Sequence, residues 1–347
     1  MTLDWLAGFG DGLANDAAVL VTVAIVEGSG PREPGTKMLV TRQQQFGTVG
    51  GGHLELRALE IARAMLADAD ATSLQRFALG PSLGQCCGGV VHLLFEPVGA
   101  ALAAVLQGLR QRRRADSWRL SAIDGPADCA LCDAQFAVLA GGGRGLPPFT
   151  PTRSSHLVRD PAGRRWLLDA CLAPRAHLTL FGAGHVGAAL VRALAELPCH
   201  VTWVDEREDM FPATLPGNVA IEVSDAPEAL VAQAPPGASF LVMTHNHALD
   251  MRLSEAILAR ADAGWFGLIG SKTKRMQFEH RLQARGCDPA RVKAMVCPIG
   301  LPGIANKAPA VLAASVAAQL LMVWEAEEQA ASAHLAQVKD KERIRCP

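Results

Sequence analysis

The chain has 347 residues, of which 50% are hydrophobic and 19% are charged, with a formal net charge of −1. This length and composition indicate a globular protein with room for two domains, each able to bury a core of its own. The near-neutral charge provides no overall attraction for nucleic acid or for an anionic membrane. Tyrosine is absent, which excludes every mechanism that needs a tyrosine acid or nucleophile.

We expect a cytoplasmic protein. The opening residues, MTLDWLAGFGDGLAND, lack the basic and apolar regions of a signal peptide. The longest apolar stretch, Ala308–Trp324, contains Pro309 and Gln319 and is too short to span a bilayer, so we expect no membrane association. Nine cysteines, an odd number, favour free thiols in a reducing compartment. The basic run Arg110–Arg114 fits the solvated end of a helix better than a nucleic-acid site.

The N-terminal part of the sequence predicts a mixed α+β domain over residues 1–175. A first helix precedes a β-branched run, Val19–Val26, which is typical of a buried strand, and a second strand is expected at Lys37–Thr41. The segment FGTVGGGHLE leads into a helix, and Val90–Phe95 predicts a further strand. Residues 99–175 combine a short helix, weak strands and loops rich in proline and glycine. The helix after FGTVGGGHLE has an apolar face formed by Leu54, Ala58, Ile61, Met65 and Leu66.

The pattern of elements changes after residue 176. Short apolar strands there alternate with helical segments, which indicates a Rossmann-like, doubly wound parallel sheet over residues 176–330. Residues 331–347 are expected to form a polar helical tail. The expected strands are His177–Phe181, Val201–Val204, Ile221–Val223, Ser239–Met243 and Trp265–Ile269, with a helix at Ala188–Leu197 after the first of them.

A dinucleotide-type fingerprint supports this fold. Gly182, Gly184 and Gly187 form G-x-G-x-x-G between the first strand and its helix, and Asp205 follows at the end of the next strand. The glycines permit a tight turn, a close approach of a pyrophosphate and close packing of helix on strand. Free amides at the helix start, where His185 lies, favour a phosphate. The pattern predicts the fold; whether NAD(P) binds is a separate question.

Two histidines follow a strand in the segment LVMTHNHALD. His245 and His247 are two residues apart and can face the same side. They are candidates to bind a metal or a polar ligand, and the alternative is a capped loop with surface histidines.

A second anion site is predicted in the segment LIGSKTKR. Ser271 is a helix cap, followed by the cations Lys272, Lys274 and Arg275. The alternative is a solvated basic helix face.

Two pairs of cysteines stand out. Cys86 and Cys87 are adjacent within GQCCGG, where flanking glycines leave the backbone open to a ligand, and such thiolates are soft donors suited to molybdenum or sulfur transfer. The alternative is a pair of inert buried cysteines. Cys129 and Cys132 form a C-x-x-C, but a structural zinc site needs four ligands and no second C-x-x-C is present. We therefore expect this pair to be structural.

Seven segments spread over both halves of the chain resemble the motifs of one protein family. In order, they are GSGPREPGTKMLV, GTVGGGHLE, LGPSLGQCCGG, LFGAGHVG, VMTHNHALD, LIGSKTKR and CPIGLP. Together they resemble the XdhC/CoxI family, the accessory proteins of xanthine dehydrogenase and carbon monoxide dehydrogenase maturation. The resemblance implies an accessory factor without metabolic activity of its own. It also implies a C-terminal Rossmann-like domain, consistent with the fingerprint.

The resemblance further implies a cargo and partners. Members bind the molybdenum cofactor (molybdopterin), protect it during sulfuration and deliver it to an apo molybdenum hydroxylase such as xanthine dehydrogenase. Expected partners are that apoenzyme, a cysteine desulfurase as sulfur donor and a second copy of the chain. The family's cysteine motif maps onto Cys86 and Cys87, so we expect molybdenum near these thiols and the pterin phosphate toward Gly184 or Ser271.

Two other classes remain open from the residues alone. An NAD(P)-dependent oxidoreductase explains the glycine fingerprint but leaves GQCCGG and GTVGGGHLE without a role, and its only evident acid/base candidates are His185, His245 and His247. A thiol-based metal or redox protein would use the two cysteine pairs.

Overall fold

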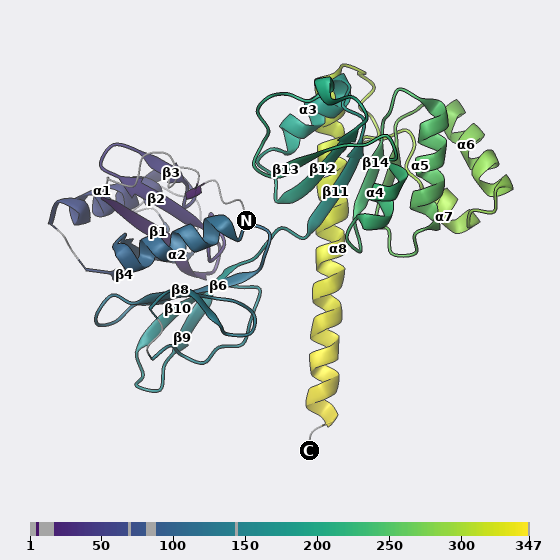
Figure 1. Ribbon diagram of the computed structural model, residues 1–347. Coiled ribbons are helices and arrows are strands. Elements are labelled where there is room, and N and C mark those ends of the chain that lie inside the picture. Colours follow the sequence, from purple (N-terminus) through teal and green to yellow (C-terminus); the bar gives the residue numbers. More distant parts are fainter. Residues whose placement is uncertain (1–4, 7–16, 69–70, 81–87, 143–144, 346–347) are drawn as a thin grey trace. The chain divides into compact units, whose positions relative to one another are not determined.

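A computed structural model describes residues 5–6, 17–68, 71–80, 88–142 and 145–345, with side chains up to residue 330. The chain divides into two compact units, residues 1–173 and 174–347 (Figure 1). In the described residues, unit 1 forms two antiparallel sheets and unit 2 forms one parallel sheet covered by helices. The mixed α+β N-terminal part and the Rossmann-like C-terminal part expected from the sequence are both confirmed.

The first sheet of unit 1 has the strand order β3-β2-β1-β5-β4 and is antiparallel throughout. Its central strand, β1, alternates strictly: Val19, Val21 and Val23 face the helix α1, and Ala18 and Leu20 face the other side. This alternation places one core under α1 and a second core on the opposite face. The elements are β1 (Ala18–Glu27), β2 (Lys37–Thr41), β3 (Gln45–Gly47), α1 (Gly52–Asp68), β4 (Ser73–Ala78) and β5 (Val90–Pro97).

The second sheet of unit 1, with the order β8-β7-β6-β10-β9, is formed by residues 117–171. The helix α2 packs its buried face both on the first sheet, at Leu20 and Leu39, and on the second, at Leu131. One apolar helix stripe therefore joins the two sheets into a single unit. The elements are α2 (Ala100–Gln111), β6 (Ser117–Ala122), β7 (Cys129–Cys132), β8 (Val138–Gly141), β9 (His156–Arg159) and β10 (Arg165–Cys171).

Unit 2 is built on a parallel sheet with the order β13-β12-β11-β14-β15. The chain moves outward from β11 to β13 and then crosses to β14 on the other side of β11, which creates a topological switch point where such folds bind ligands. The strands are β11 (Ala176–Phe181), β12 (Cys199–Asp205), β13 (Val219–Val223), β14 (Ser239–Val242) and β15 (Phe266–Leu268).

Helices cover both faces of this sheet. The core on one face joins the sheet to α3 and α8, and the core on the other joins it to α4, α5, α6 and α7. Unit 2 is thus doubly wound, as expected. The helices are α3 (His185–Leu194), α4 (Glu228–Gln233), α5 (His247–Ala259), α6 (Lys272–Ala284), α7 (Pro289–Ala294) and α8 (Pro309–Arg345).

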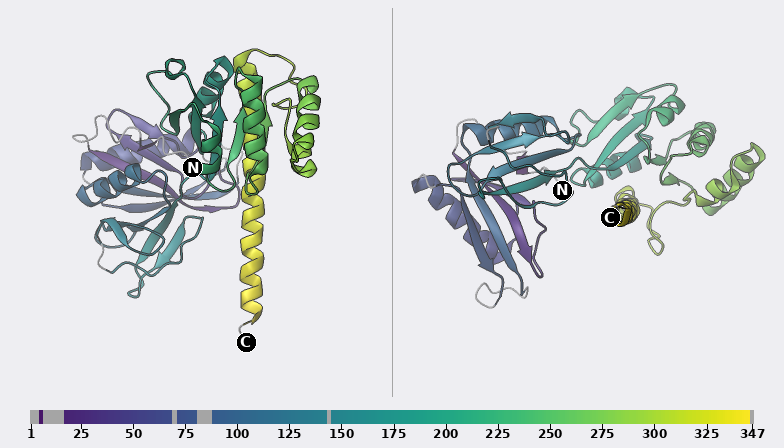
Figure 2. Two further views of the ribbon diagram at one scale, coloured as in Figure 1. Left: turned by 45° about the vertical axis from the view of Figure 1, so that its right-hand side comes forward. Right: turned by 90° about the horizontal axis from the view of Figure 1, so that it is seen from below.

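The last helix, α8, begins as a core helix of unit 2. Val316 and Leu320 are fully buried against the sheet, and Trp324 Nε1 donates to Ser239 Oγ at 3.0 Å. By length and composition Pro309–Ala330 could also cross a membrane, so the expectation that this stretch is too short to span a bilayer is wrong. Val316, Leu320 and Trp324 are nevertheless buried in the core of unit 2. The remainder of α8 continues past the end of the sheet (Figures 1 and 2).

Most strands expected from the sequence are confirmed to within two residues, including Lys37–Thr41 without change. The expected Ala188–Leu197 helix forms, but α3 already begins at His185, inside the glycine fingerprint. The short strands β3 and β4 were not expected. The basic run Arg110–Arg114 lies at the end of α2, as expected. The expected first helix falls almost wholly outside the described residues.

Candidate functional site

The glycine turn of unit 2 has the geometry that its fingerprint predicts. Gly182 has a φ of +117°, and a Cβ there would lie 2.5 Å from the Met243 carbonyl oxygen. A Cβ on Gly187 would lie 2.2 Å from the Gly182 carbonyl oxygen, so only glycine allows α3 to pack this closely. Around Gly184, the N-cap of α3, there is open space instead. The first and third glycines thus shape the backbone, and the second leaves room at the helix start.

The acidic residue of the fingerprint, Asp205, is fully engaged by the protein. Its Oδ2 accepts from Ala183 N at 2.7 Å and from Arg207 Nη2 at 3.0 Å. Its Oδ1 accepts from Arg207 Nε at 2.9 Å and from Arg207 N at 3.1 Å. Burial raises the pKa of this carboxyl, but the hydrogen bonds from Arg207 and Ala183 outweigh burial, and the pKa is lowered. Asp205 therefore stays ionised and ties the glycine turn to the end of β12.

A small hollow of about 20 Å³ opens to solvent beside this turn. Its walls come from the carboxyl ends of β11, β12 and β14 and from the α4 and α5 side, which places it at the switch point of the sheet. Asp205 and His245 line it, so two sequence-predicted residues meet here. The lining comprises Phe181, Gly182, Val204, Asp205, Glu206, Ser224, Pro227, Thr244, His245, Leu249 and Leu253.

The two histidines after β14 are both exposed. Between them, Asn246 caps α5 by accepting from Ala248 N at 2.9 Å and from Leu249 N at 3.2 Å. Within the described residues, no group of three or more His, Cys, Asp or Glu side chains is placed to hold a metal. The capped-loop alternative accounts for this geometry, with His245 facing the hollow and His247 beginning α5.

A buried ion pair holds the start of α5 to α6. Lys274 Nζ lies 2.6 Å from Asp250 Oδ2 and 2.9 Å from the Ile269 carbonyl oxygen. Thr244 Oγ1 donates to the other oxygen of Asp250 at 2.7 Å. Lys274, expected from the sequence to bind an anion, is therefore committed to an internal carboxylate.

The predicted anion site at α6 retains one uncommitted cation. Ser271 caps the helix by accepting from Lys274 N at 3.2 Å. Arg275 pairs with Glu279 at 2.8 Å and donates to the Cys297 carbonyl oxygen at 3.2 Å. Lys272 is exposed and has no ion pair with any described residue. Of the three cations in the segment, Lys272 alone remains available to a ligand.

In unit 1, three motif loops meet at one end of the first sheet. Cys86 and Cys87 lie outside the described residues. Leu79, which precedes them, and Gly89, which follows them, are joined by a hydrogen bond in which Leu79 N donates to the Gly89 carbonyl oxygen at 2.8 Å. A Cβ on Gly89 would lie 2.3 Å from the Ser29 carbonyl oxygen. The end of GQCCGG therefore packs directly on the loop EGSGPREPGT.

The loop GTVGGGHLE joins the same end of the sheet. A Cβ on Gly50 would lie 2.6 Å from Pro31 Cγ, so this loop also contacts EGSGPREPGT. Glu55, in the first turn of α1, holds the loop by accepting from Thr48 Oγ1 and from the amides of Val49 and Gly51 at 3.1 Å each. Burial raises the pKa of Glu55, but the hydrogen bonds that it accepts outweigh burial, and the pKa is lowered below its usual value.

We call the meeting of residues 28–36, 47–52 and 88–89 the motif-loop cluster. It carries the exposed side chains of Ser29 and Arg32, and the exposed His53 follows it in α1. Arg32 forms no ion pair with any residue that the structure describes. It is a cation that the sequence analysis did not single out.

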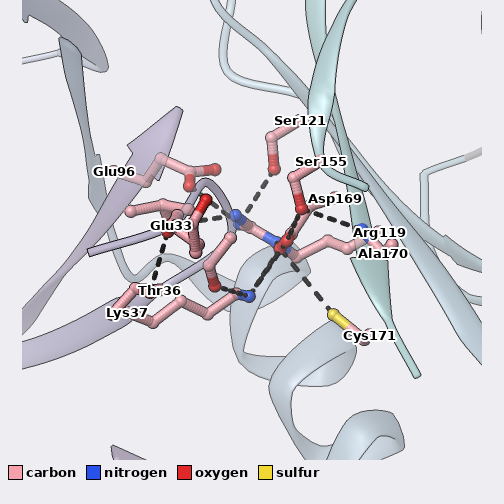
Figure 3. A network of polar contacts seen from close by, with 12 residues as sticks. Glu33, Thr36, Lys37, Glu96, Arg119, Ser121, Ser155, Asp169, Ala170 and Cys171 are labelled. Carbon is pink, nitrogen blue, oxygen red and sulfur yellow. Dashed lines mark hydrogen bonds and ion pairs between the residues drawn. The ribbon is translucent and has the colours of Figure 1, made fainter. Parts of the chain in front are cut away.

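Behind this cluster lies a buried charge network that joins the two sheets of unit 1 (Figure 3). Asp169 of β10 accepts from Lys37 Nζ of β2 at 3.0 Å and from Arg119 Nε of β6 at 2.9 Å. Arg119 also donates to Glu96 of β5 at 2.7 Å and to Thr22 of β1 at 3.1 Å. Two cations and two carboxylates balance each other in the interior, as buried charges require.

The C-x-x-C sequence does not form a chelating pair. Cys129 packs in the core under α2, whereas Cys132 packs in the core with Trp118 and Trp166 on the opposite face of the sheet. Residues three apart on a strand point to opposite faces. Burial raises the pKa of Cys129 to about 11 and also raises that of Cys132. Both thiols are structural, as expected.

Comparison with known proteins gives two matches to family models. The XdhC and CoxI family model matches residues 13–78, and the XdhC Rossmann domain model matches residues 178–320. The two matches together span more than half of the chain. The chain belongs to the XdhC/CoxI family.

The fold is also similar to a crystal structure described as that of a xanthine dehydrogenase from Bacillus halodurans. The TM-score is 0.72 at 20% sequence identity, over 94% of this chain and 96% of that one. At this identity the similarity shows the fold alone. No curated protein matches the chain.

Proposed function

We propose that the chain is an accessory factor in xanthine dehydrogenase maturation, without catalytic activity of its own. It binds the molybdenum cofactor as cargo, protects it while a cysteine desulfurase supplies sulfur, and delivers it to the apoenzyme. It acts in the cytoplasm as a homodimer. Membership of the XdhC/CoxI family supports the role in maturation.

The observation that carries the cargo proposal is the motif-loop cluster. Three family segments that are far apart in the sequence pack together at one end of a sheet, with glycine backbones exposed between them. The adjacency of β1, β2, β3 and β5 in the sheet brings these segments together, and a single ligand at this end of the sheet can therefore contact all three. Gly89, two residues after Cys87, is part of this packing.

The residues of the cluster fit the chemistry of the cargo. The cargo has a soft molybdenum centre, for which the Cys86 and Cys87 thiols are suitable donors. It also ends in a phosphate, for which Arg32 is an exposed cation at the cluster. We propose that the two thiols shield the molybdenum and that Arg32 pairs with the phosphate.

A transfer assay tests this function. Apo xanthine dehydrogenase is mixed with sulfurated cofactor and the wild-type chain, or with a Cys86→Ser/Cys87→Ser variant, and urate formation is followed. We expect activation with the wild type and at least a tenfold lower yield with the variant. The control is Cys287→Ser, a half-buried thiol of unit 2, which should activate like the wild type. Equal activation by the double variant would refute the role of the thiols, and no dependence on the chain would refute the function.

A further inference from the structure

A glutamate–histidine pair lies beside the motif-loop cluster of unit 1. Glu27, the last residue of β1, places its Oε1 3.0 Å from Nε2 of His92 on β5. The imidazole is 17% exposed and the carboxylate is 60% exposed. Among the described residues, His92 alone pairs with this carboxylate. A carboxylate can accept about four hydrogen bonds, so both oxygens of Glu27 remain open to a further donor.

Backbone contacts fix Glu27 at the point where two of the motif loops meet. A Cβ on Gly89 would lie 2.7 Å from the Glu27 carbonyl oxygen, and a Cβ on Gly28 would lie 3.5 Å from Gly89 Cα. Gly28 begins the cluster and Gly89 ends GQCCGG, so the glutamate belongs to the contact between the two segments. The hydrogen bond to His92 limits its rotamers, and a side chain that is held beforehand loses less entropy on binding.

The glycine next to this contact keeps the surface bare. Gly89 is required by packing, since a Cβ there would also lie 2.3 Å from the Ser29 carbonyl oxygen. Gly88 is different, because its φ lies outside the left-handed region and a Cβ there would have no described heavy atom within 4 Å. Neither packing nor backbone conformation accounts for glycine at this position. Its effect is an uncovered stretch of backbone that a flat ring can approach closely.

An exposed carboxylate that is held in place beside bare backbone suits one class of ligand. It repels phosphate groups, and within the described residues no group of three or more His, Cys, Asp or Glu side chains is placed to hold a metal. Two carboxylate oxygens accept best from two adjacent N–H donors on one rigid edge, the geometry that makes guanidinium–carboxylate contacts bidentate. The 2-aminopyrimidin-4-one ring of a pterin has such an edge, formed by its 2-amino group and its N3–H.

We propose that Glu27 recognises the pterin of the cargo by accepting from its 2-amino group and N3–H, with the ring lying over the backbone of Gly88. His92 acts as a positioning residue that holds the carboxylate. This inference rests on the proposed function and extends it to the recognition of the ring. Glu27 repels the phosphate that Arg32 attracts, so the two side chains receive opposite ends of the cargo.

Binding of two ring analogues to the full chain tests this assignment. Pterin-6-carboxylate and lumazine-6-carboxylate differ at position 2, where lumazine has a carbonyl oxygen in place of the amino donor. Titration followed by the fluorescence of the ligand measures both dissociation constants. We expect the pterin to bind about tenfold more tightly, because the lumazine loses one charge-assisted hydrogen bond. Equal affinities, or no binding of the pterin at millimolar concentration, would overturn the proposal.

Matched variants assign the effect to the pair. Glu27→Gln should bring the two affinities to within about threefold of each other, whereas Glu60→Gln, at an exposed glutamate that pairs with Arg57, should leave the difference intact. His92→Ala should weaken binding of the pterin severalfold and preserve its preference over the lumazine, since the carboxylate remains. A preference that survives in Glu27→Gln would overturn the role of Glu27, and unchanged binding in His92→Ala would overturn that of His92.

Guanine carries the same donor edge as a pterin, so GMP is titrated in the same assay. We expect it to bind no more tightly than pterin-6-carboxylate, and tighter binding would overturn the pterin assignment in favour of a guanine nucleotide. Retention of released molybdenum cofactor on gel filtration shows whether the proposed function itself fails. No retention by the wild type would refute the function, whereas equal retention by the wild type and Glu27→Gln would refute only the role of Glu27.

Discussion

Lys37, at the start of β2, and Asp169, in the middle of β10, form an ion pair of 2.9 Å in which neither side chain is exposed. Lys37 is also the lysine of the motif GSGPREPGTK, and its ammonium donates to the Gly35 carbonyl oxygen at 2.7 Å. The pair therefore fastens the motif-loop cluster to the second sheet. We infer that the motif lysine orders the loop and does not contact a ligand.

Breaking this pair should destabilise the protein strongly. Asp169→Asn leaves Lys37 and Arg119 sharing one remaining carboxylate in the interior, and removal of one partner of a buried pair costs about 3–5 kcal/mol. Urea unfolding at pH 7 measures the loss. Glu60→Gln, which removes the exposed pair of Glu60 with Arg57, should change the free energy of unfolding by less than about 1 kcal/mol. Equal effects of the two substitutions would contradict the assigned role of the network.

The same carboxylate predicts how stability depends on pH. Burial raises the pKa of Asp169, but Lys37 and Arg119 outweigh burial, and the pKa is lowered below its usual value. Its stabilising effect is therefore complete above the unfolded pKa of about 4 and is lost as the pH falls through the lower folded pKa. The difference in unfolding free energy between wild type and Asp169→Asn should be constant from pH 7 to 5 and shrink below pH 4. A difference that grows on acidification would contradict this assignment.

The buried thiols of β7 should be unreactive in the native protein. At pH 8, Cys129 and Cys132 should be alkylated by iodoacetamide far more slowly than Cys287, as measured by peptide mass spectrometry, because burial keeps them protonated and inaccessible. All three should react alike in urea. Rapid native labelling of the pair, or zinc that is lost in Cys129→Ala/Cys132→Ala, would show that the C-x-x-C is functional after all.

Substitution by alanine should lower the stability of the protein to different extents at two glycines of the same turn. Gly187→Ala forces a Cβ to within 2.2 Å of the Gly182 carbonyl oxygen, so we expect a loss of at least about 1–3 kcal/mol through overpacking. Gly184→Ala meets open space and should cost less than about 1 kcal/mol. Thermal unfolding followed by circular dichroism compares them, and similar melting temperatures would argue against the close packing of α3.

The parts of the fold that were predictable from the sequence are those whose signals are local. The glycine fingerprint and the β-branched strands have a regular spacing, so β1, β2 and β11 could be predicted with nearly their observed bounds. The second sheet gave only weak signals because β6 is buried on both faces yet carries Arg119 and two serines. Its partner Asp169 lies 50 residues away along the chain. From the sequence alone, a charged residue whose partner is brought to it only by folding cannot be distinguished from a charged residue on the surface.

In the candidate site too, features set by local sequence were predictable and features set by tertiary contacts were not. Asp205 and the glycines were predictable, since turn geometry fixes their positions, and so was the Ser271 cap. The commitment of Lys274 to Asp250, and of Asp205 to Arg207, depends on side-chain packing that no spacing rule reveals. The contact between Gly50 and Pro31 likewise required the sheet to be assembled.

The most direct test of the proposed function is a binding measurement. The chain is mixed anaerobically with released molybdenum cofactor and separated by gel filtration, and molybdenum and pterin are quantified in the protein peak. We predict near-stoichiometric retention by the wild type and by Cys287→Ser, and a severalfold loss in Cys86→Ser/Cys87→Ser and in Arg32→Ala. Absence of molybdenum and pterin from the wild-type peak would contradict the account.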